Sequence, residues 1–273
     1  LAAYGFLISQ IIMFFAITGS VLAARVLLDN RSFASLGLAL DSKAWLDLVV
    51  GIGIAALMMG VIFLIEWVAG WLNFQDFAWN LQDPKTLFTN IAIFLGIFIV
   101  VGWQEELLIR GYWLQNLEEG LNLYWAIAIS SFIFGAAHLG NPGFSIFSLI
   151  GLLISGSFLA YGYISSKRLW LPIGLHIGWN FFEGCIFGFP VSGVNTPRLL
   201  VHTLSGPSRI TGGSFGPESG LILLPALAIG TFFVWAYTTS TESDLDDEDD
   251  HLEEMEDAEE EIQVIEEEQG IAS

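Results

Sequence analysis

Three sets of polar side chains interrupt long apolar stretches of this 273-residue chain, in the segments WQEELLIRGYW, FIFGAAHLGNP and LPIGLHIGWNFFEG. In chain order they are Glu105, Glu106 and Arg110, then Phe134 and His138, then His176, Asn180 and Glu183. A carboxylate beside an imidazole can activate water as a general base. Imidazole and amide N–H groups can stabilise the oxyanion of a tetrahedral intermediate. The same carboxylate and imidazoles can instead hold a metal ion whose bound water becomes the nucleophile. These residue types therefore point to hydrolysis, and the sequence leaves both ways of activating water open.

The first set predicts one paired and one unpaired carboxylate. Glu106 and Arg110 are four residues apart, so on a helix they share a face and can form a charge-assisted pair. Glu105 is turned about 100° away on the same helix, which leaves its carboxylate free for chemistry. A charge cluster at the interfacial end of a helix would explain all three residues as well.

The other two sets each have a structural alternative. His176 and Asn180 are also four residues apart, and Glu183 follows on the same predicted stripe. A polar stripe on an apolar helix must face the interior of a bundle, where it can also serve as interhelical hydrogen bonding. His138 stands beside a Gly-Asn-Pro break, and a histidine there can simply pack or cap a helix.

The composition says which elements position these residues. Apolar types make up 54% of the chain and charged types only 14%, against roughly 25% charged in a typical soluble domain. Since a bilayer core of ~30 Å needs about 20 apolar residues in a helix, we predict an all-α polytopic membrane bundle of about seven spans. The third of these spans should continue through its charges to about Leu117. The predicted spans are 4–28, 45–70, 87–103, 123–139, 144–165, 169–189 and 221–238.

We divide the chain into four parts on this basis. Residues 1–86 hold the first spans and RSFASLGLAL, a short amphipathic segment expected at the membrane interface. Residues 87–190 hold the polar sets, 191–240 a long Gly/Ser/Pro-rich loop and the last span, and 241–273 an acidic tail. Because Leu1 already lies within apolar sequence, an upstream helix or signal segment stays open.

The net charge of −20 is unevenly distributed. Of 29 acids, 17 fall between Glu242 and Glu268, so the remainder has 12 acids against nine bases. We expect the tail to be disordered and solvated. Without a basic patch, nucleic acid is not an expected partner. Lys and Arg favour one side of the predicted spans by six to three, which places that side and the tail in the cytoplasm.

The depth of the polar residues suggests that they meet. A short turn near residues 118–122 joins the third and fourth spans, and Glu105 and His138 lie roughly 20 and 24 Å from that turn at ~1.5 Å per residue. His176 can join them through the helix break at Pro172. We therefore predict one polar cavity between three helices.

The motifs EExxxR, FxxxH and HxxxN, in this order on successive membrane helices, resemble the CPBP family over about residues 90–190. That family comprises type II CAAX prenyl proteases and bacteriocin-processing, or Abi, intramembrane endopeptidases. The resemblance implies that Glu105 and His138 position and activate water, while His176 and Asn180 stabilise the oxyanion. Glu106 and Arg110 complete the first motif, and their helix spacing makes them a supporting pair. We expect Phe134 and Glu183 to be supporting residues as well. The family is described both as metalloproteases and as glutamic proteases, so Glu105, His138 and His176 holding a divalent metal such as zinc stays an alternative.

The expected function is therefore hydrolysis of a peptide bond in a membrane-associated or lipidated substrate by a multi-pass protein of the cell membrane. Membrane lipid and that peptide or lipidated protein are the expected partners. A non-proteolytic membrane scaffold or immunity protein of the same family is the alternative. A proton-coupled transporter that uses Glu105, Glu183 and the histidines as a relay is a third class.

Overall fold

The computed structural model describes residues 2–241 of the chain, with side chains from residue 5 onward. The predicted disordered tail at 242–273 lies outside the described residues. Residues up to Phe232 form one compact unit, which holds all of the predicted site residues. Residues 233–241, the end of the last helix, belong to a second unit.

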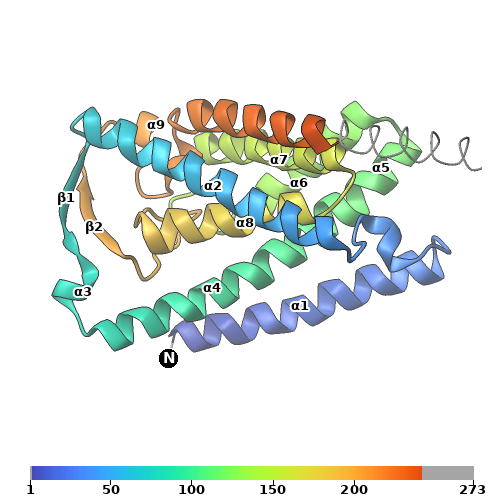
Figure 1. Cartoon of the computed structure of the whole chain (residues 1–273), viewed down its shortest axis with the longest axis horizontal. Coiled ribbons are helices and arrows are strands. Elements are labelled where there is room, and N and C mark those ends of the chain that lie inside the picture. The colour runs from blue at the N-terminus through green and yellow to red at the C-terminus, as the bar shows by residue number, and fades with distance from the viewer. Residues whose placement is uncertain (1, 242–273) are drawn as a thin grey trace, which may run out of the picture. The chain divides into compact units, whose positions relative to one another are not determined.

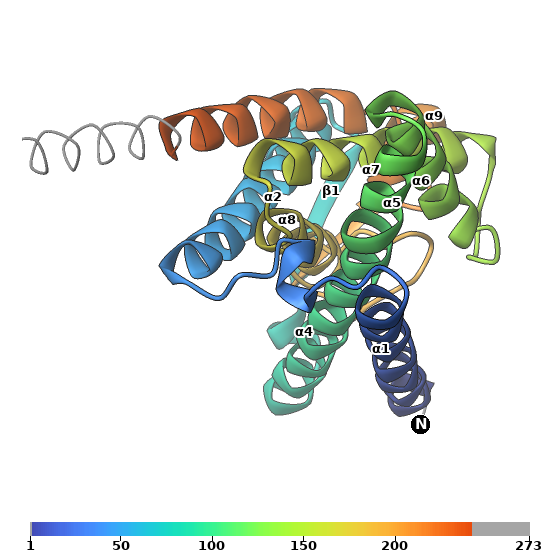
Figure 2. The ribbon, with the colours of Figure 1, turned by 90° about the vertical axis from the view of Figure 1, so that its right-hand side faces the viewer.

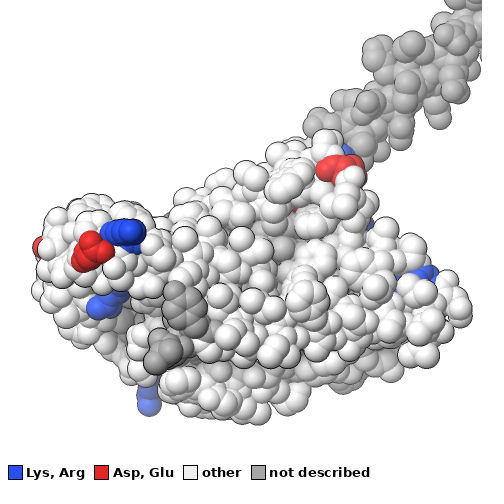
Figure 3. Space-filling view, turned by 90° about the horizontal axis from the view of Figure 1, so that it is seen from below, with Lys and Arg blue, Asp and Glu red and all other residues white. Residues whose placement is uncertain are grey.

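Apolar helices make up most of the described chain, as predicted (Figure 1). Five helices are long and apolar enough to cross a membrane, and they are Gly5–Leu27, Ser42–Val68, Pro84–Gly120, Ile146–Ser166 and Leu223–Thr241. The other two predicted spans are shorter helices, α6 (Leu123–Ala137) and α8 (Trp170–Asn180). On the face shown in Figure 3, acidic and basic side chains are few and scattered. The protein is a helical integral membrane protein.

Side-chain caps fix where several helices begin. Asp41 accepts a hydrogen bond from a backbone N–H at the start of α2 (Ser42–Val68), and Asp83 does the same for α4 (Pro84–Glu106), whose first residue is proline. Asn122 caps α6, and Ser145 forms a capping box at the start of α7 (Ile146–Ser166). Each cap satisfies a backbone N–H that has no partner within the helix.

Two helices continue without a break through π-helical segments. α4 passes into η2 (Leu107–Trp113) and then α5 (Leu114–Gly120), so the predicted continuation of the third span past its charges is confirmed. α8 passes into η3 (Phe181–Ile186) in the same way. Single π-helical turns inside α-helices occur frequently at functional sites.

Glycines set the position of α8 against its neighbours. A Cβ on Gly174 would lie 2.3 Å from the carbonyl oxygen of Leu48, and one on Gly178 would lie 2.8 Å from the Cα of Ile52. Only glycine allows α2 and α8 to approach so closely, and Figures 1 and 2 show the two helices side by side. On α4, a Cβ on Gly102 would meet a side-chain carbon of α8 at 2.7 Å. α8 is thus held closely between α2 and α4.

The segment predicted as a long loop is largely ordered. It contains β2 (Leu200–Leu204), α9 (Ser208–Thr211) and η4 (Pro217–Ser219). β2 pairs antiparallel with β1 (Leu72–Phe77), which is followed by the short helix α3 (Ala78–Leu81). This two-stranded sheet was not predicted, because its strands are short and 123 or more residues apart by their paired positions.

The RSFASLGLAL segment packs partly into the bundle instead of lying wholly at the interface. It forms the 3-10 helix η1 (Phe33–Leu36), which follows α1 (Ala2–Leu27). Leu36 and Leu38 are buried in a cluster with Leu107 of η2, whereas Leu40 is exposed. The apolar face of this segment therefore contacts protein, and its end remains accessible.

Candidate active site

One cavity of about 340 Å³ receives all four predicted catalytic side chains. Glu105 comes from α4, His138 from the end of α6, and His176 and Asn180 from α8. Apolar residues of α1 and α4 form much of its wall. The three sets of polar residues therefore converge as the depth argument predicts.

Glu106, Arg110 and His176 form a buried cluster beside this cavity. Arg110 donates from Nη1 to Glu106 Oε1 at 2.8 Å and from Nη2 to the carbonyl oxygen of Gly156 at 3.0 Å. Both charged side chains are fully buried, and the predicted i,i+4 pair is confirmed. Glu106 Oε1 also lies 2.7 Å from His176 Nδ1. Because the carboxylate accepts, Nδ1 carries the hydrogen and Nε2 faces away from this cluster.

The side chain of Glu105 points away from the buried cluster that Glu106 joins. Its side chain is 29% exposed, and its Oε2 lies 3.9 Å from His176 Nε2. The His176 ring thus stands between two carboxyls, bonded to Glu106 on one side and facing Glu105 on the other. Glu105 is the carboxylate with access to water.

His138 caps the C-terminal end of α6, and its tautomer follows from one hydrogen bond. Its Nδ1 lies 2.8 Å from the carbonyl oxygen of Phe134. A carbonyl can only accept, so Nδ1 donates, and a neutral ring then keeps a lone pair on Nε2. The ring of Phe134 packs against both histidines, with centroids 5.1 Å from His138 and 5.9 Å from His176. The Arg110 guanidinium lies 4.6 Å from the same ring. Phe134 thereby separates the arginine from the cavity.

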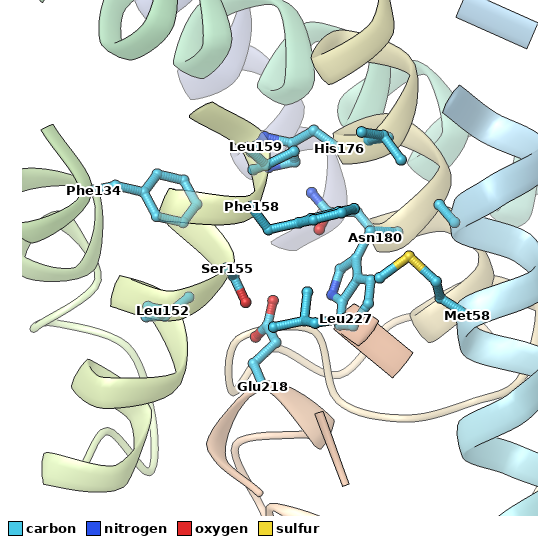
Figure 4. A pocket seen from close by; sticks show the side chains of 13 residues that line it. Met58, Phe134, Leu152, Ser155, Phe158, Leu159, His176, Asn180, Glu218 and Leu227 are labelled. Atoms are coloured by element: carbon cyan, nitrogen blue, oxygen red, sulfur yellow. The ribbon is translucent and has the colours of Figure 1, made fainter. Parts of the chain in front are cut away.

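A second, smaller cavity of about 40 Å³ adjoins the first on the far side of His176 and Asn180. Figure 4 shows its lining, in which Ser155 of α7 and Glu218 of η4 project toward the same space. Phe134, His176, Asn180 and Glu218 line both cavities. The Asn180 amide therefore stands at the boundary between the two.

Two further acids lie close by, and only one reaches the cavities. Glu183, predicted on the stripe of His176, is fully buried in η3 beside the indole of Trp179 and is absent from both linings. Glu218 lines both cavities, accepts a hydrogen bond from Ser192 Oγ at 2.6 Å, and is 5% exposed. Burial raises the pKa of the Glu218 carboxyl. Sequence reasoning missed Glu218 because it is an isolated acid in a loop, and the density of glycines around it is the sole signal in that segment.

The described residues do not form a three-ligand metal site. No group of three or more His, Cys, Asp or Glu side chains in this part of the chain has the proximity that a metal ion requires. His176 Nδ1 is bonded to Glu106, and the gap between its Nε2 and Glu105 is 3.9 Å. Two ligands at about 2.0–2.2 Å from one metal ion lie roughly 3.3–3.6 Å from each other, so this gap is slightly wider than a shared metal ion needs. A divalent metal held by Glu105, His138 and His176 stays a prediction.

Comparison with known proteins agrees with the motifs. Residues 87–182 match the family described as type II CAAX prenyl endopeptidase Rce1-like. This segment is therefore similar to the family that the three motifs resemble. The Rce1-like segment runs from α4 to just past Asn180, so it contains the four predicted catalytic residues and ends before Glu183 and Glu218.

The chain is also similar to a protein of Bacillus subtilis (strain 168) named "Putative membrane peptidase YdiL". The two are 26% identical over 156 residues, which is 57% of this chain and 59% of the relative. The chain thus spans less than two thirds of the length of this curated relative. No solved structure matches.

Proposed function

We propose that this protein is an intramembrane endopeptidase that hydrolyses a peptide bond of a membrane-associated or lipidated substrate. The observation that carries the proposal is the cavity that joins Glu105, His138, His176 and Asn180 within a bundle of apolar helices. Ionisable residues inside a membrane bundle are costly, and they mark a functional site. The similarity of residues 87–182 to a family described as endopeptidases supports the same activity.

The arrangement favours water activated by glutamate. Glu105 removes a proton from a water molecule, while the lone pair on His138 Nε2 accepts the second hydrogen and orients the oxygen. The water oxygen then attacks the carbonyl carbon of the substrate. His176, whose Nδ1–H bonds to the buried Glu106 carboxylate, can carry a second hydrogen on Nε2 and donate it to the oxyanion. Asn180 supplies a further N–H from the next turn of α8.

The cavity wall supports an apolar substrate. Its lining includes Phe6, Met13 and Ile17 of α1 and Phe94 and Ile97 of α4. Such a wall suits a peptide that carries a lipid or lies among membrane lipids, and nothing in the lining provides the basic surface that a nucleic acid needs. We place the protein in the cell membrane with its acidic tail in the cytoplasm, on the excess of Lys and Arg at that side of the spans.

Substitution of Glu105 tests the proposal. Purified protein in liposomes is given a fluorescence-quenched peptide that carries an S-farnesyl cysteine three residues before its C-terminus. Cell membranes with wild-type and variant protein are compared in parallel for new peptide termini. Glu105→Gln and His138→Ala should each lower kcat by on the order of 10²–10⁴. Glu119→Gln, at an exposed acid paired with Arg31, is the matched control and should cleave normally.

The fold of each variant can be followed at the same time. Cys185 is fully buried and is the one cysteine of the chain, so a thiol-reactive dye reports unfolding. Full cleavage by both site variants would contradict the proposal. Retention of the cellular role by an inactive Glu105→Gln protein would favour the scaffold or immunity alternative. In the zinc alternative, a chelator should remove both bound metal and activity, whereas the glutamate route should tolerate chelation.

A further inference from the structure

Glu218 reaches the cavity from outside the family-matched segment, and its backbone is fixed by close packing. A Cβ on Gly151 of α7 would lie 1.7 Å from the carbonyl oxygen of Glu218, so η4 rests directly on that helix. Ser148, one turn earlier on α7, donates to the hydroxyl of Ser219 at 3.1 Å. The loop therefore presents Glu218 from a fixed position.

The carboxyl of Glu218 is tied to the residues around His138. Ser192 Oγ donates to Glu218 Oε2 at 2.6 Å, and the carbonyl oxygen of Ser192 accepts from Asn141 Nδ2 at 2.9 Å. Asn141 belongs to the turn that follows His138 and also lines the larger cavity. A chain of hydrogen bonds thus joins the loop to the end of α6. It holds Glu218 in a defined relation to the proposed water-activating histidine.

The two carboxyls of the larger cavity have different surroundings. Glu105 is 29% exposed, whereas Glu218 is 5% exposed. The titratable groups that face Glu218 are His138 from α6, His176 from α8 and the buried Glu183 from η3. Burial raises the pKa of Glu218, while the hydrogen bonds from Ser192 and the two histidines act in the opposite direction. Two carboxyls in such different environments can divide the roles of base and acid.

Peptide hydrolysis needs such an acid. An amine anion is a very poor leaving group, so the nitrogen must gain a proton as the C–N bond breaks. Glu105, His138, His176 and Asn180 account for the water and the oxyanion. The proposed reaction therefore still lacks a dedicated proton donor on the leaving side.

Resting on the proposed function, we propose that Glu218 is a further catalytic residue, whose carboxylic acid donates a proton to the amide nitrogen of the substrate. Water gives one proton to Glu105 and its oxygen bonds to the carbonyl carbon. The C–N bond then breaks as the nitrogen takes the proton of Glu218. Transfer of a proton from Glu105 through water back to Glu218 restores both groups. The smaller cavity has room for about one or two waters, and its polar lining from Ser155, Asn180 and Glu218 suits them.

Changing the leaving group of the substrate distinguishes proton donation by Glu218 from a structural role or a role in water activation. The farnesylated peptide is compared with an analogue whose scissile amide is replaced by a 4-nitrophenyl ester, since nitrophenolate leaves without a proton. Glu218→Gln should lower kcat on the amide by on the order of 10² or more and leave cleavage of the ester at the wild-type rate. Glu105→Gln should lose both activities. Glu66→Gln, which alters another buried carboxyl, on α2, is the matched control and should keep both activities.

Equal losses by Glu218→Gln on the amide and the ester would overturn the proposal, as would full activity on the amide. Failure of the wild-type protein to cleave either compound would count against the proposed function and not against the state of Glu218. The protonation state of Glu218 can be measured separately by infrared spectroscopy. The wild-type spectrum minus that of Glu218→Gln should contain the carbonyl band of a protonated carboxylic acid at neutral pH, and absence of the band would refute the assignment.

A second variant keeps the test usable if Glu218→Gln does not fold. Ser192→Ala removes a hydrogen bond that favours the charged carboxylate, so it raises the pKa of Glu218 further. The alkaline limb of kcat/KM for the amide should then move to higher pH. An unmoved limb would contradict the acid role.

Discussion

Two arginine–carboxylate clusters contact α8 in very different surroundings. The buried cluster consists of Arg110, Glu106 and His176. The turn cluster lies between α7 and α8, where Arg168 Nε donates to Asp47 Oδ2 at 2.8 Å and its Nη1 donates to Asp41 Oδ2 at 3.0 Å. The side chains of the buried ion pair are fully shielded from solvent, whereas Arg168 is 19% and Asp41 47% exposed.

The difference shows what each environment demands. In the turn cluster water reaches Arg168 and Asp41 and can replace a lost partner there, so their pair adds little stability, although Asp47 is itself buried. In the buried cluster no water is at hand, and a charge left without its partner is strongly unfavourable. The buried cluster also fixes the tautomer of a site residue, since Glu106 bonds to His176 Nδ1. Similar chemistry thus anchors one end of α8 and orients the functional middle.

Removing the acid of the buried cluster should have the largest effect on stability. Glu106→Ala leaves the guanidinium of Arg110 and the Nδ1–H of His176 without their common acceptor. We expect the free energy of unfolding to fall by about 3–5 kcal/mol. The midpoint of thermal unfolding, followed by dye reaction at Cys185, measures the change.

The double variant Glu106→Ala/Arg110→Met is the control for that measurement. It removes both charges, so it should lose less stability than Glu106→Ala alone. Glu105→Ala, at the neighbouring exposed acid, should unfold close to the wild-type midpoint. If Glu106→Ala did so as well, the contrast between the two clusters would fail.

A matched change in the turn cluster should have a smaller effect. Asp47→Asn removes the charge that Arg168 Nε contacts but keeps an oxygen acceptor. Because Asn keeps the acceptor and Arg168 stays paired with Asp41, we expect a smaller loss than for Glu106→Ala. Salt should reduce this loss further, because the arginine is partly solvated. Thermal unfolding at low and high ionic strength checks both statements. If Asp47→Asn lowered the free energy of unfolding as much as Glu106→Ala, the two clusters would contribute equally to stability and the contrast would fail.

The smallest effect is expected from pH. Hydrogen bonds from Arg168 lower the pKa of Asp41, so the folded state binds fewer protons at this site than the unfolded state. The stabilisation is therefore complete above the unfolded pKa of about 3.9 and is lost as the pH falls through the lower folded pKa. Thermal melts followed by circular dichroism below about pH 4 should drop more steeply for wild type than for Asp41→Asn. If stability fell with pH equally in the two proteins, the hydrogen bonds from Arg168 to Asp41 would not contribute to stability.

The sequence predicted features that depend on local helix geometry. The spacing of Glu106 and Arg110 predicted their pair, because residues four apart share a helix face. The continuation of the third span past these charges was predicted to about Leu117, and the helix ends at Gly120. Local periodicity was sufficient in both cases.

The features that the sequence did not predict depend on contacts between distant segments. The hydrogen bond that His176 donates to Glu106 joins residues 70 positions apart, and its geometry depends on the close packing of α8 against α4. Glu183 was predicted from an α-helical stripe, but the π-helical segment after Asn180 changes the rotation of the residues beyond it. Glu218 depends on how a loop docks on Gly151, which no periodic pattern encodes.

The π-helical segment η2 changes the direction in which side chains point along the continuous helix formed by α4, η2 and α5. Upstream of it, Glu106 must point at Arg110 and His176; downstream of it, Gln115 must accept from Arg25 of α1 at 3.2 Å. A π-helical segment takes up an extra residue relative to an ordinary α-helical turn. Deleting one residue from η2 would rotate α5 by about 100° relative to α4. Gln115 would then no longer face Arg25, and the hydrogen bond between α5 and α1 would be lost. The extra residue thus lets one continuous helix direct Glu106 toward Arg110 and His176 and also direct Gln115 toward Arg25.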